Sequence, residues 1–216
     1  MKRQIIALGG GGFAMEPRNK RLDNYILSQA NSSNPKVCFV PTASGDSRRY
    51  IQKFYRFFDK QDCIPSHLEL FKPIYSDFES FLLGQDIIYV GGGNTRNMLL
   101  LWKEWGIDKI LRKAYNQGIL ITGMSAGAIC WFEQGITDPE NGELYPLDCL
   151  GFLSGSSCPH YDGEAERKPA YKKLILYGSA KGGYGIDDGV ALHFVNEQLF
   201  KAVSSRKKAK AFFAYA

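Results

Sequence analysis

The chain has 216 residues, of which 44% are hydrophobic and 23% are charged, and its formal net charge is +5. This composition is typical of a globular protein and excludes a low-complexity or collagen-like chain. The length predicts one domain over residues 1–216. A basic run lies near the C-terminus without aromatic interleaving or a nucleic-acid reader motif, so we expect it to be solvated and expect no nucleic-acid partner.

The five cysteines and the first residues of the chain indicate in which cellular compartment the protein is expected. The cysteine number is odd and no C-x-x-C pair occurs, so we predict neither a disulfide framework nor a zinc site. Cys38 and Cys130 lie in apolar runs and are expected in the core, whereas the role of Cys158 stays open. The apolar run at residues 5–8 is too short for a signal peptide or a membrane span. We therefore expect a cytoplasmic protein that needs no membrane, metal or cofactor.

In the first part of the chain, short apolar runs alternate with segments of helical spacing. The predicted strands are Gln4–Leu8, Val37–Pro41, His67–Leu70, Ile87–Val90 and Ile119–Thr122. The predicted helices are Arg21–Gln29, Arg48–Asp59, Phe78–Leu83 and Thr95–Asn116, the last broken in two near Trp105-Gly106. Strands that are apolar throughout and separated by helices predict an α/β fold, with a mainly parallel central sheet and helices on both faces.

The second part of the chain has a different pattern. Turn-forming residues, among them Pro139 and Asn141, dominate from residue 137 to residue 163. A helix over residues 164–177 would start or kink near Pro169. Four strand-like segments follow, with a hairpin turn at residues 196–198, and we expect them to extend the parallel sheet as antiparallel strands; they are Tyr184–Asp187, Val190–Val195, Leu199–Val203 and Ala211–Tyr215.

A serine motif stands where one predicted strand ends. Gly123-Met124-Ser125-Ala126-Gly127 follows the apolar run before it and leads into a helix-compatible segment. G-x-S-x-G between a strand and a helix is typical of a nucleophile elbow, in which a strained turn exposes the serine Oγ. The next residue opens the helix, so the Ala126 N–H can face developing negative charge. The motif therefore predicts Ser125 as a nucleophile and Ala126 as one donor of an oxyanion hole.

The second oxyanion donor is expected from the glycine run at residues 91–93, and Gly92 is our choice. Absent side chains there allow the backbone to approach a substrate closely. Asn94 and Thr95 start the next helix, where they can cap it or touch substrate. Similar small-residue loops at residues 9–12 and 42–46 also follow predicted strands. Because the carboxyl ends of parallel strands meet at one edge, we expect these loops to share a site.

A serine hydroxyl needs an adjacent base, and histidine is the usual one. The chain has three histidines, of which His67 and His193 lie in strand-like segments. His160 lies in a loop and is the candidate base. A carboxylate should then orient the imidazole, and the sequence leaves more than one choice open. The candidates are Asp188, its neighbour Asp187, and Asp138 after the elbow helix.

In their order and spacing, these motifs resemble the peptidase E and cyanophycinase family of serine peptidases. The segments that carry the resemblance are 89–95, 123–128, 158–161 and 185–192. The resemblance implies a fold like that of class I glutamine amidotransferases, which is flavodoxin-like, and a Ser–His–acid peptidase that uses no metal. It implies Ser125 as nucleophile and His160 as base, and it places Asp188 where the family tends to have a glutamate. Amidotransferase relatives have cysteine at the elbow, so the serine argues against ammonia transfer.

The resemblance also implies a small peptide substrate. Peptidase E removes an N-terminal aspartate from dipeptides, which requires a cation for the acidic side chain. Arg167, seven residues after His160, is the expected cation, and Arg96 near the glycine run is a second candidate. We therefore expect cleavage after an N-terminal aspartyl or similar acidic residue, by an enzyme that can be a homodimer.

The sequence also permits two alternative interpretations. Gly9-Gly10-Gly11-Gly12-Phe13-Ala14 formally matches the G-x-G-x-x-A pattern of a dinucleotide site, although the residues that follow do not continue as a helix. The chain could also be a non-catalytic or divergent amidotransferase-like binding protein that kept the fold.

Overall fold

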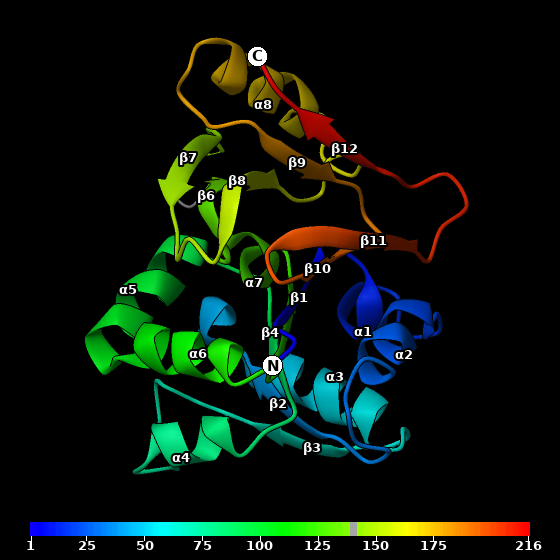
Figure 1. The fold of residues 1–216 in the computed structure, drawn as a ribbon, viewed down its shortest axis with the longest axis vertical. Helices are drawn as coiled ribbons and strands as arrows, with labels where there is room; N and C mark the ends of the chain where they lie inside the picture. The colour runs from blue at the N-terminus through cyan, green and yellow to red at the C-terminus, as the bar shows by residue number, and fades with distance from the viewer. Residues whose placement is uncertain (139–141) are drawn as a thin grey trace.

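Two β-sheets form the centre of the computed structural model, which describes residues 1–138 and 142–216 (Figure 1). The larger sheet has the order β11-β10-β1-β5-β4-β2-β3 and the smaller one β12-β9-β8-β6-β7. The strands of the larger sheet are β1 (Gln4–Leu8), β2 (Lys36–Val40), β3 (Ile64–His67), β4 (Ile87–Val90), β5 (Leu120–Met124), β10 (Val190–Val195) and β11 (Gln198–Ser204). Those of the smaller sheet are β6 (Phe132–Thr137), β7 (Tyr145–Asp148), β8 (Leu153–Cys158), β9 (Gly183–Ile186) and β12 (Ala211–Ala214).

The predicted parallel core is confirmed, except that its edge strand is Ile64–His67 and not the expected His67–Leu70. Strands β1, β5, β4, β2 and β3 pair in parallel, in that order. Both faces of β1, β2, β4 and β5 are largely buried, because successive side chains point to opposite faces and each face meets helices, whereas the edge strand β3 is only partly buried. In β1, for example, Ile6 and Leu8 pack into one apolar cluster, whereas Ile5 and Ala7 pack into another.

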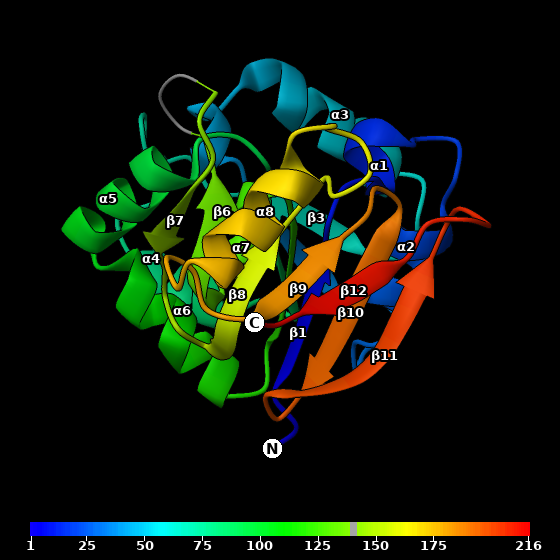
Figure 2. The ribbon, with the colours of Figure 1, turned by 90° about the horizontal axis from the view of Figure 1, so that it is seen from above.

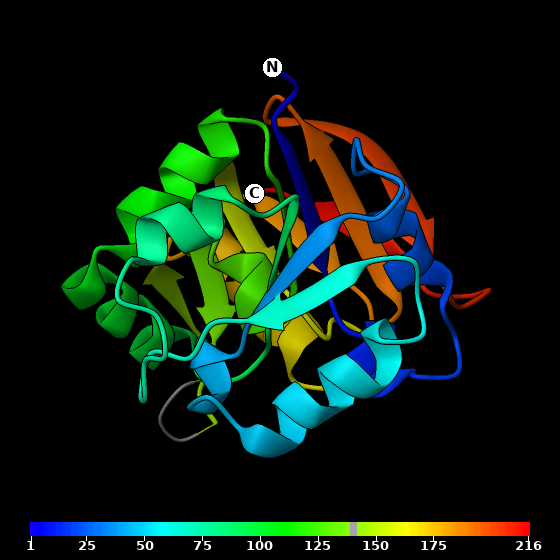
Figure 3. The ribbon, with the colours of Figure 1, turned by 90° about the horizontal axis from the view of Figure 1, so that it is seen from below.

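Helices cover both faces of this sheet, as predicted. One face carries α1 (Gly12–Met15), α2 (Arg21–Leu27) and α3 (Arg48–Phe58), and the other carries α4 (Phe78–Leu83), α5 (Thr95–Trp105), α6 (Ile107–Asn116) and α7 (Ala126–Ile129). Seen from below, the cyan helix α3 and the green helices α5 and α6 lie on opposite sides of the sheet (Figure 3). The break between α5 and α6 falls at Gly106, whose φ of 70° suits glycine.

The C-terminal strands follow the prediction only in part. Strand β10 pairs antiparallel with β1, and β11 pairs antiparallel with β10, so these two strands extend the parallel sheet as expected. The expectation is wrong for residues 184–187 and 211–215. Strand β9 pairs with β8 and β12 pairs with β9, at the edge of the smaller sheet (Figure 2).

The smaller sheet accounts for most of the remaining differences. The elbow helix α7 is a single turn that is followed directly by strand β6. Strands β7 and β8 lie within residues 137–163, where turn-forming residues led us to expect loops. Pro139 and Asn141 lie outside the described residues. Helix α8 (Arg167–Leu176) begins close to Pro169, as predicted. In the described ranges, no helix has both the length and the apolar character needed to cross a lipid bilayer.

One ionisable group lies in the core beneath the first glycine loop. Asp23 in α2 is fully buried, and neither of its carboxyl oxygens has a hydrogen-bond partner among the described residues. Its neighbours include Tyr89, whose hydroxyl also lacks a partner, and Gly12, where a Cβ would lie 3.2 Å from Asp23 Oδ1. Burial raises the pKa of Asp23 to about 7, although the nearby Phe13 backbone and Tyr89 act in the opposite direction.

This group predicts a pH dependence of stability. In the folded protein Asp23 stays protonated up to about pH 7, whereas in the unfolded chain it ionises near its ordinary value of 3.8. Folding therefore takes up a proton between these values, and Asp23 lowers the free energy of unfolding by about 1.4 kcal/mol per pH unit as the pH rises from about 4 to 7. Asp23→Asn removes this contribution. Urea unfolding of both proteins from pH 5 to 8 should show the wild type losing stability relative to the variant, and a constant difference would contradict the account.

Candidate active site

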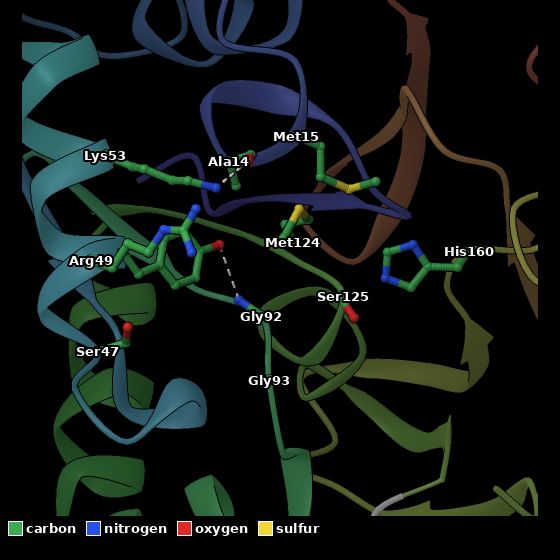
Figure 4. A pocket seen from close by; sticks show the side chains of 11 residues that line it. Ala14, Met15, Ser47, Arg49, Lys53, Gly92, Gly93, Met124, Ser125 and His160 are labelled. Carbon is green, nitrogen blue, oxygen red and sulfur yellow. Dashed lines mark hydrogen bonds between the residues drawn. The ribbon is translucent and has the colours of Figure 1, made fainter.

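A pocket of about 470 Å³ opens at the carboxyl ends of the parallel strands (Figure 4). The glycine run, the serine elbow and the loop after β8 line it, together with residues of α1 and α3. The expected shared site is thus present only in part, because no residue of loops 9–12 and 42–46 lines the pocket. The lining residues are Ala14, Met15, Ser47, Arg49, Tyr50, Lys53, Gly92, Gly93, Met124, Ser125 and His160.

Ser125 stands in the strained turn that the motif predicted. Its φ is 55° and its ψ is −114°, a conformation that is costly for a residue with a side chain. The turn is held from both sides, because the Ser125 N–H donates to the Leu8 carbonyl at 3.0 Å and the Ser125 carbonyl accepts from Ala128 and Ile129. Small neighbours are required as well, since a Cβ on Gly123 would lie 2.2 Å from the carbonyl oxygen of Gly127.

His160 forms a short hydrogen bond with Asp188. Its Nδ1 lies 2.7 Å from Asp188 Oδ1, and the two side chains are only 16% and 11% exposed. Burial disfavours the ionised carboxylate, but the hydrogen bond and charge of His160, together with the Arg206 and Arg167 guanidinium groups, outweigh it and lower the pKa of Asp188. Asp188 is therefore ionised at neutral pH and accepts the Nδ1–H, which leaves Nε2 for other chemistry.

Ser125 and His160 lie on neighbouring parts of the same pocket wall, one from the elbow after β5 and the other from the loop after β8 (Figure 4). No hydrogen bond joins these two side chains, both of which the structure describes. Hydrogen bonds between catalytic groups are often long without substrate and tighten when substrate binds. The arrangement thus brings a strained serine, a histidine and an ionised carboxylate to one place.

The other candidate carboxylates have different partners. Asp187 accepts a hydrogen bond from the Lys210 N–H at 2.8 Å, and burial raises its pKa. Asp138 is exposed and lies 3.3 Å from Arg167. Of the three acids left open by the sequence, Asp188 is the one that the structure brings to His160.

The remaining histidines and Cys158 serve the framework. His67 in β3 hydrogen-bonds with Tyr55, and His193 in β10 with Tyr25 and Gln4. Burial lowers the pKa of His193 to about 4, so it is neutral. Burial also raises the pKa of Cys158 to about 12, and the thiol is therefore unreactive at neutral pH.

The first glycine loop makes room for the His160–Asp188 pair. A Cβ on Gly10 would lie 2.0 Å from Asp188 Oδ1 and 3.0 Å from His160 Nδ1, and a Cβ on Gly9 would lie 2.3 Å from the Ile186 carbonyl oxygen. The space above these glycines is thus filled by protein atoms. The dinucleotide alternative loses its basis, because its glycines would have to leave the backbone open to a pyrophosphate.

The two predicted oxyanion donors differ in their surroundings. The Ala126 N–H has no acceptor among the described residues. The Gly92 N–H donates to the Tyr50 hydroxyl at 3.3 Å. Burial raises the pKa of Tyr50 to about 12, so this hydroxyl keeps its proton. Tyr50 was missed from the sequence because it lies on α3, far along the chain from the serine and histidine motifs.

The three residues expected to bind substrate do not face this pocket. Asn94 caps α5 by accepting from the Asn97 N–H at 2.9 Å, and Thr95 is buried. Arg167 is only 6% exposed and is held by three partners. Those partners are Glu164 at 2.6 Å, the Ile136 carbonyl at 3.3 Å and Asp138 at 3.3 Å.

Two cations that the sequence reasoning did not select face the pocket instead. Arg49 and Lys53, one helical turn apart on α3, lie on its wall opposite His160 (Figure 4). Lys53 Nζ also donates to the Ala14 carbonyl at 3.4 Å. In the sequence, the basic residues at helical spacing just after loop 42–46 could have indicated these two cations. In the described ranges, no group of three or more His, Cys, Asp or Glu residues is arranged to hold a metal ion.

The Gly10 contact leads to a structural prediction. Gly10→Ala should push Asp188 away from His160, because the new methyl group would overlap the carboxylate. We expect the low-field proton resonance of His160 Nδ1–H to disappear or move strongly upfield in NMR spectra. Gly84→Ala is the control, since Gly84 has a φ of −84° and a Cβ there would meet its first neighbour at 3.2 Å. An unchanged resonance in a folded Gly10→Ala variant would contradict the packing described.

The sequence matches a known protein family and several curated proteins. The model of peptidase family S51 matches residues 5–202. The chain is 61% identical over 210 residues to the uncharacterized peptidase YgaJ of Bacillus subtilis (strain 168), covering 97% of this chain and 91% of that protein. It is 25% identical over 187 residues to the uncharacterized peptidase Lin0382 of Listeria innocua serovar 6a, covering 83% and 90% respectively.

A solved structure shares the fold. The crystal structure of a peptidase from an acI-B1 Actinobacterium has a TM-score of 0.73 to this chain at 18% sequence identity, covering 99% of this chain and 95% of that one. The family match spans the glycine run, the serine elbow and the His160–Asp188 pair. The chain therefore belongs to peptidase family S51, the peptidase E family, and is a serine peptidase.

Proposed function

We propose that this peptidase releases an N-terminal acidic residue from short peptides by a Ser–His–Asp mechanism. The observation that carries the proposal is the 2.7 Å hydrogen bond between His160 and Asp188 beside the strained Ser125. A carboxylate on Nδ1 fixes the imidazole tautomer, so that Nε2 can take the serine proton. Ser125 then attacks the carbonyl carbon of the first peptide bond and forms a tetrahedral intermediate.

The oxyanion of that intermediate needs preorganised donors. The Ala126 N–H is available at the start of α7, and the Gly92 N–H can exchange its 3.3 Å bond with Tyr50 for a bond to the oxyanion. His160 next donates its proton to the leaving amine, which departs as the shortened peptide. Water, activated by the same histidine, releases the N-terminal residue and restores Ser125.

Recognition of the acidic residue is assigned to Arg49 and Lys53. Both line the pocket, and neither forms an ion pair with a described carboxylate, so each can bind a substrate carboxylate without first breaking an ion pair. Arg167 is less suited, because its guanidinium already binds Glu164 and Asp138. Between the cations and the histidine lie Met15 and Met124, which offer apolar surface to the substrate backbone (Figure 4).

The catalytic assignment can be tested with an activity probe and acid variants. A fluorophosphonate should label the wild type, and Ser125→Ala should abolish labelling, whereas Ser47→Ala, a serine on the same pocket, should retain it. Asp188→Asn should lower kcat for an Asp-Leu dipeptide by roughly 10²–10⁴-fold, because the tautomer is no longer fixed. Asp138→Asn should change it by less than about three-fold. A larger loss with Asp138→Asn would show that the third residue is misassigned.

The specificity assignment predicts a change in KM. Arg49→Ala and Lys53→Ala should each raise KM for Asp-Leu about ten-fold, the equivalent of one lost charge-assisted contact of about 1.4 kcal/mol. The neutral analogue Asn-Leu should be affected by less than about two-fold. Arg48→Ala is the control, since this exposed neighbour does not line the pocket. Equal losses for both dipeptides would indicate that the two cations do not read the acidic side chain.

A further inference from the structure

A second pocket lies next to the first, on the other side of Ala14, Met15 and Lys53. It has a volume of about 440 Å³. The two pockets share these three residues, and Lys53 bonds to the Ala14 carbonyl on the wall between them. A peptide in the first pocket would thus have to cross only these three residues to reach the second. The other residues lining the second pocket are Phe13, Pro17, Lys20, Arg56, Phe57, Lys60 and Gln61.

The charged residues of the two pockets follow one face of α3. Arg49, Lys53, Arg56 and Lys60 are spaced by four, three and four residues, which places them in one row along the helix and the turn after it. We call this row the basic face of α3. Like charges at this spacing destabilise a helix, and a bound anion would offset this repulsion. Lys20 adds a fifth cation from across the second pocket.

The basic face of α3 has no acidic counterpart in the described chain. No aspartate or glutamate lines either pocket, and none of its four residues forms an ion pair with a described carboxylate. Asp59 and Asp62 flank Lys60 in sequence but line neither pocket. Lys20 contacts the uncharged Gln61, at 3.5 Å. The positive charge is thus left for a ligand.

The floor of the second pocket suits a peptide. Phe13 and Phe57 are buried beneath it, and Met15 and Pro17 border it, so the cations surround apolar surface. A carboxylate carried on an aliphatic stem matches such a site better than a bare inorganic anion does, because its methylene groups can cover that surface. The pocket also adjoins the serine site, since Ala14, Met15 and Lys53 line both pockets.

We propose that the second pocket is an anion subsite for the leaving part of an acidic peptide. In this arrangement Lys20, Arg56 and Lys60 bind a carboxylate on the second or third residue, while Arg49 and Lys53 hold that of the first. This inference rests on the proposed function for the position of the scissile bond. The substrate class is then a short peptide that is acidic on both sides of the bond that is cleaved.

The test compares two amidated tripeptides, Asp-Glu-Glu-amide and Asp-Gln-Gln-amide, which differ only in the charge of the leaving part. The wild type should cleave the acidic peptide with a KM about ten-fold lower, equivalent to about 1.4 kcal/mol. Arg56→Ala combined with Lys60→Ala should reduce this ratio to less than about two-fold. Arg56→Glu combined with Lys60→Glu should reverse it. Raising the salt concentration should weaken the preference of the wild type, because exposed charges are screened.

A matched control changes the net charge equally elsewhere. Arg48→Ala combined with Lys109→Ala also removes two exposed cations, and neither residue lines either pocket. This double variant should keep the ten-fold ratio. If it lost the ratio as well, the preference would come from overall charge and the subsite would be overturned. Thermal unfolding of every variant checks that it is folded.

A binding measurement separates this inference from the proposed function. Ser125→Ala should bind fluorescein-labelled Asp-Glu-Glu-amide, with the dye on the C-terminal side, about ten-fold more tightly than the Gln counterpart, as read by fluorescence anisotropy. If the wild type cleaved neither peptide but this difference persisted and required Arg56 and Lys60, the proposed function would fail and the subsite would stand. If cleavage occurred without a preference, the subsite would fail. Tighter binding of tripolyphosphate or a short oligonucleotide than of the acidic peptide would also overturn the assignment.

Discussion

The His160–Asp188 hydrogen bond lies where the two sheets meet, and main-chain hydrogen bonds to the end of β1 and the loop after it hold the pair beside Ser125. His160 follows β8 of the smaller sheet, and Asp188 lies in the link from β9 to β10, where the chain passes from one sheet to the other. Both approach the loop after β1: the His160 N–H donates to Gly9 and the Gly189 N–H donates to Gly10. The elbow after β5 is bonded to the end of β1 as well. Main-chain hydrogen bonds at the carboxyl end of β1 therefore set the position of the histidine relative to the serine. These bonds also hold Ser125 and His160 in conformations with positive φ.

The parallel core could be predicted because burial on both faces leaves a plain mark in the sequence. Strand β1 is Gln4–Leu8 and β4 is Ile87–Val90, as expected, since continuous apolar runs between helices have few other interpretations. Strands β7 and β8 of the smaller sheet have no such continuous apolar run. Strand β8 contains three serines and a glycine, and β7 contains a proline, so composition alone suggested loops. Partners distant in the chain, rather than local preference, make these segments strands.

The site divides in the same way. Ser125, His160 and Asp188 could be selected because each stands in a motif whose spacing restricts its geometry. Arg167 was selected by its sequence distance from His160, but that distance does not show where the side chain points. The Arg167 side chain binds Glu164, whereas cations from α3 face the pocket. Sequence spacing relates residues of one element, but it does not say which distant helix closes a pocket. That relation depends on packing around the aromatic cluster under α3, which includes Phe13 and lies between the sheet and the helices.

The charges around the site are arranged so that negative charge faces His160 while positive charge faces an acidic substrate. Arg206 approaches Asp188 at 4.0 Å, but its guanidinium is bonded to Glu16 at 2.7 Å. Glu16 therefore offsets part of the positive charge beside Asp188, and the carboxylate remains the main charge facing His160. In the proposed reaction His160 gains a proton, and a cation free to approach would oppose that step. The unpaired cations of α3 are kept beyond the methionines of the pocket, where they can attract an acidic substrate while negative charge prevails next to the histidine.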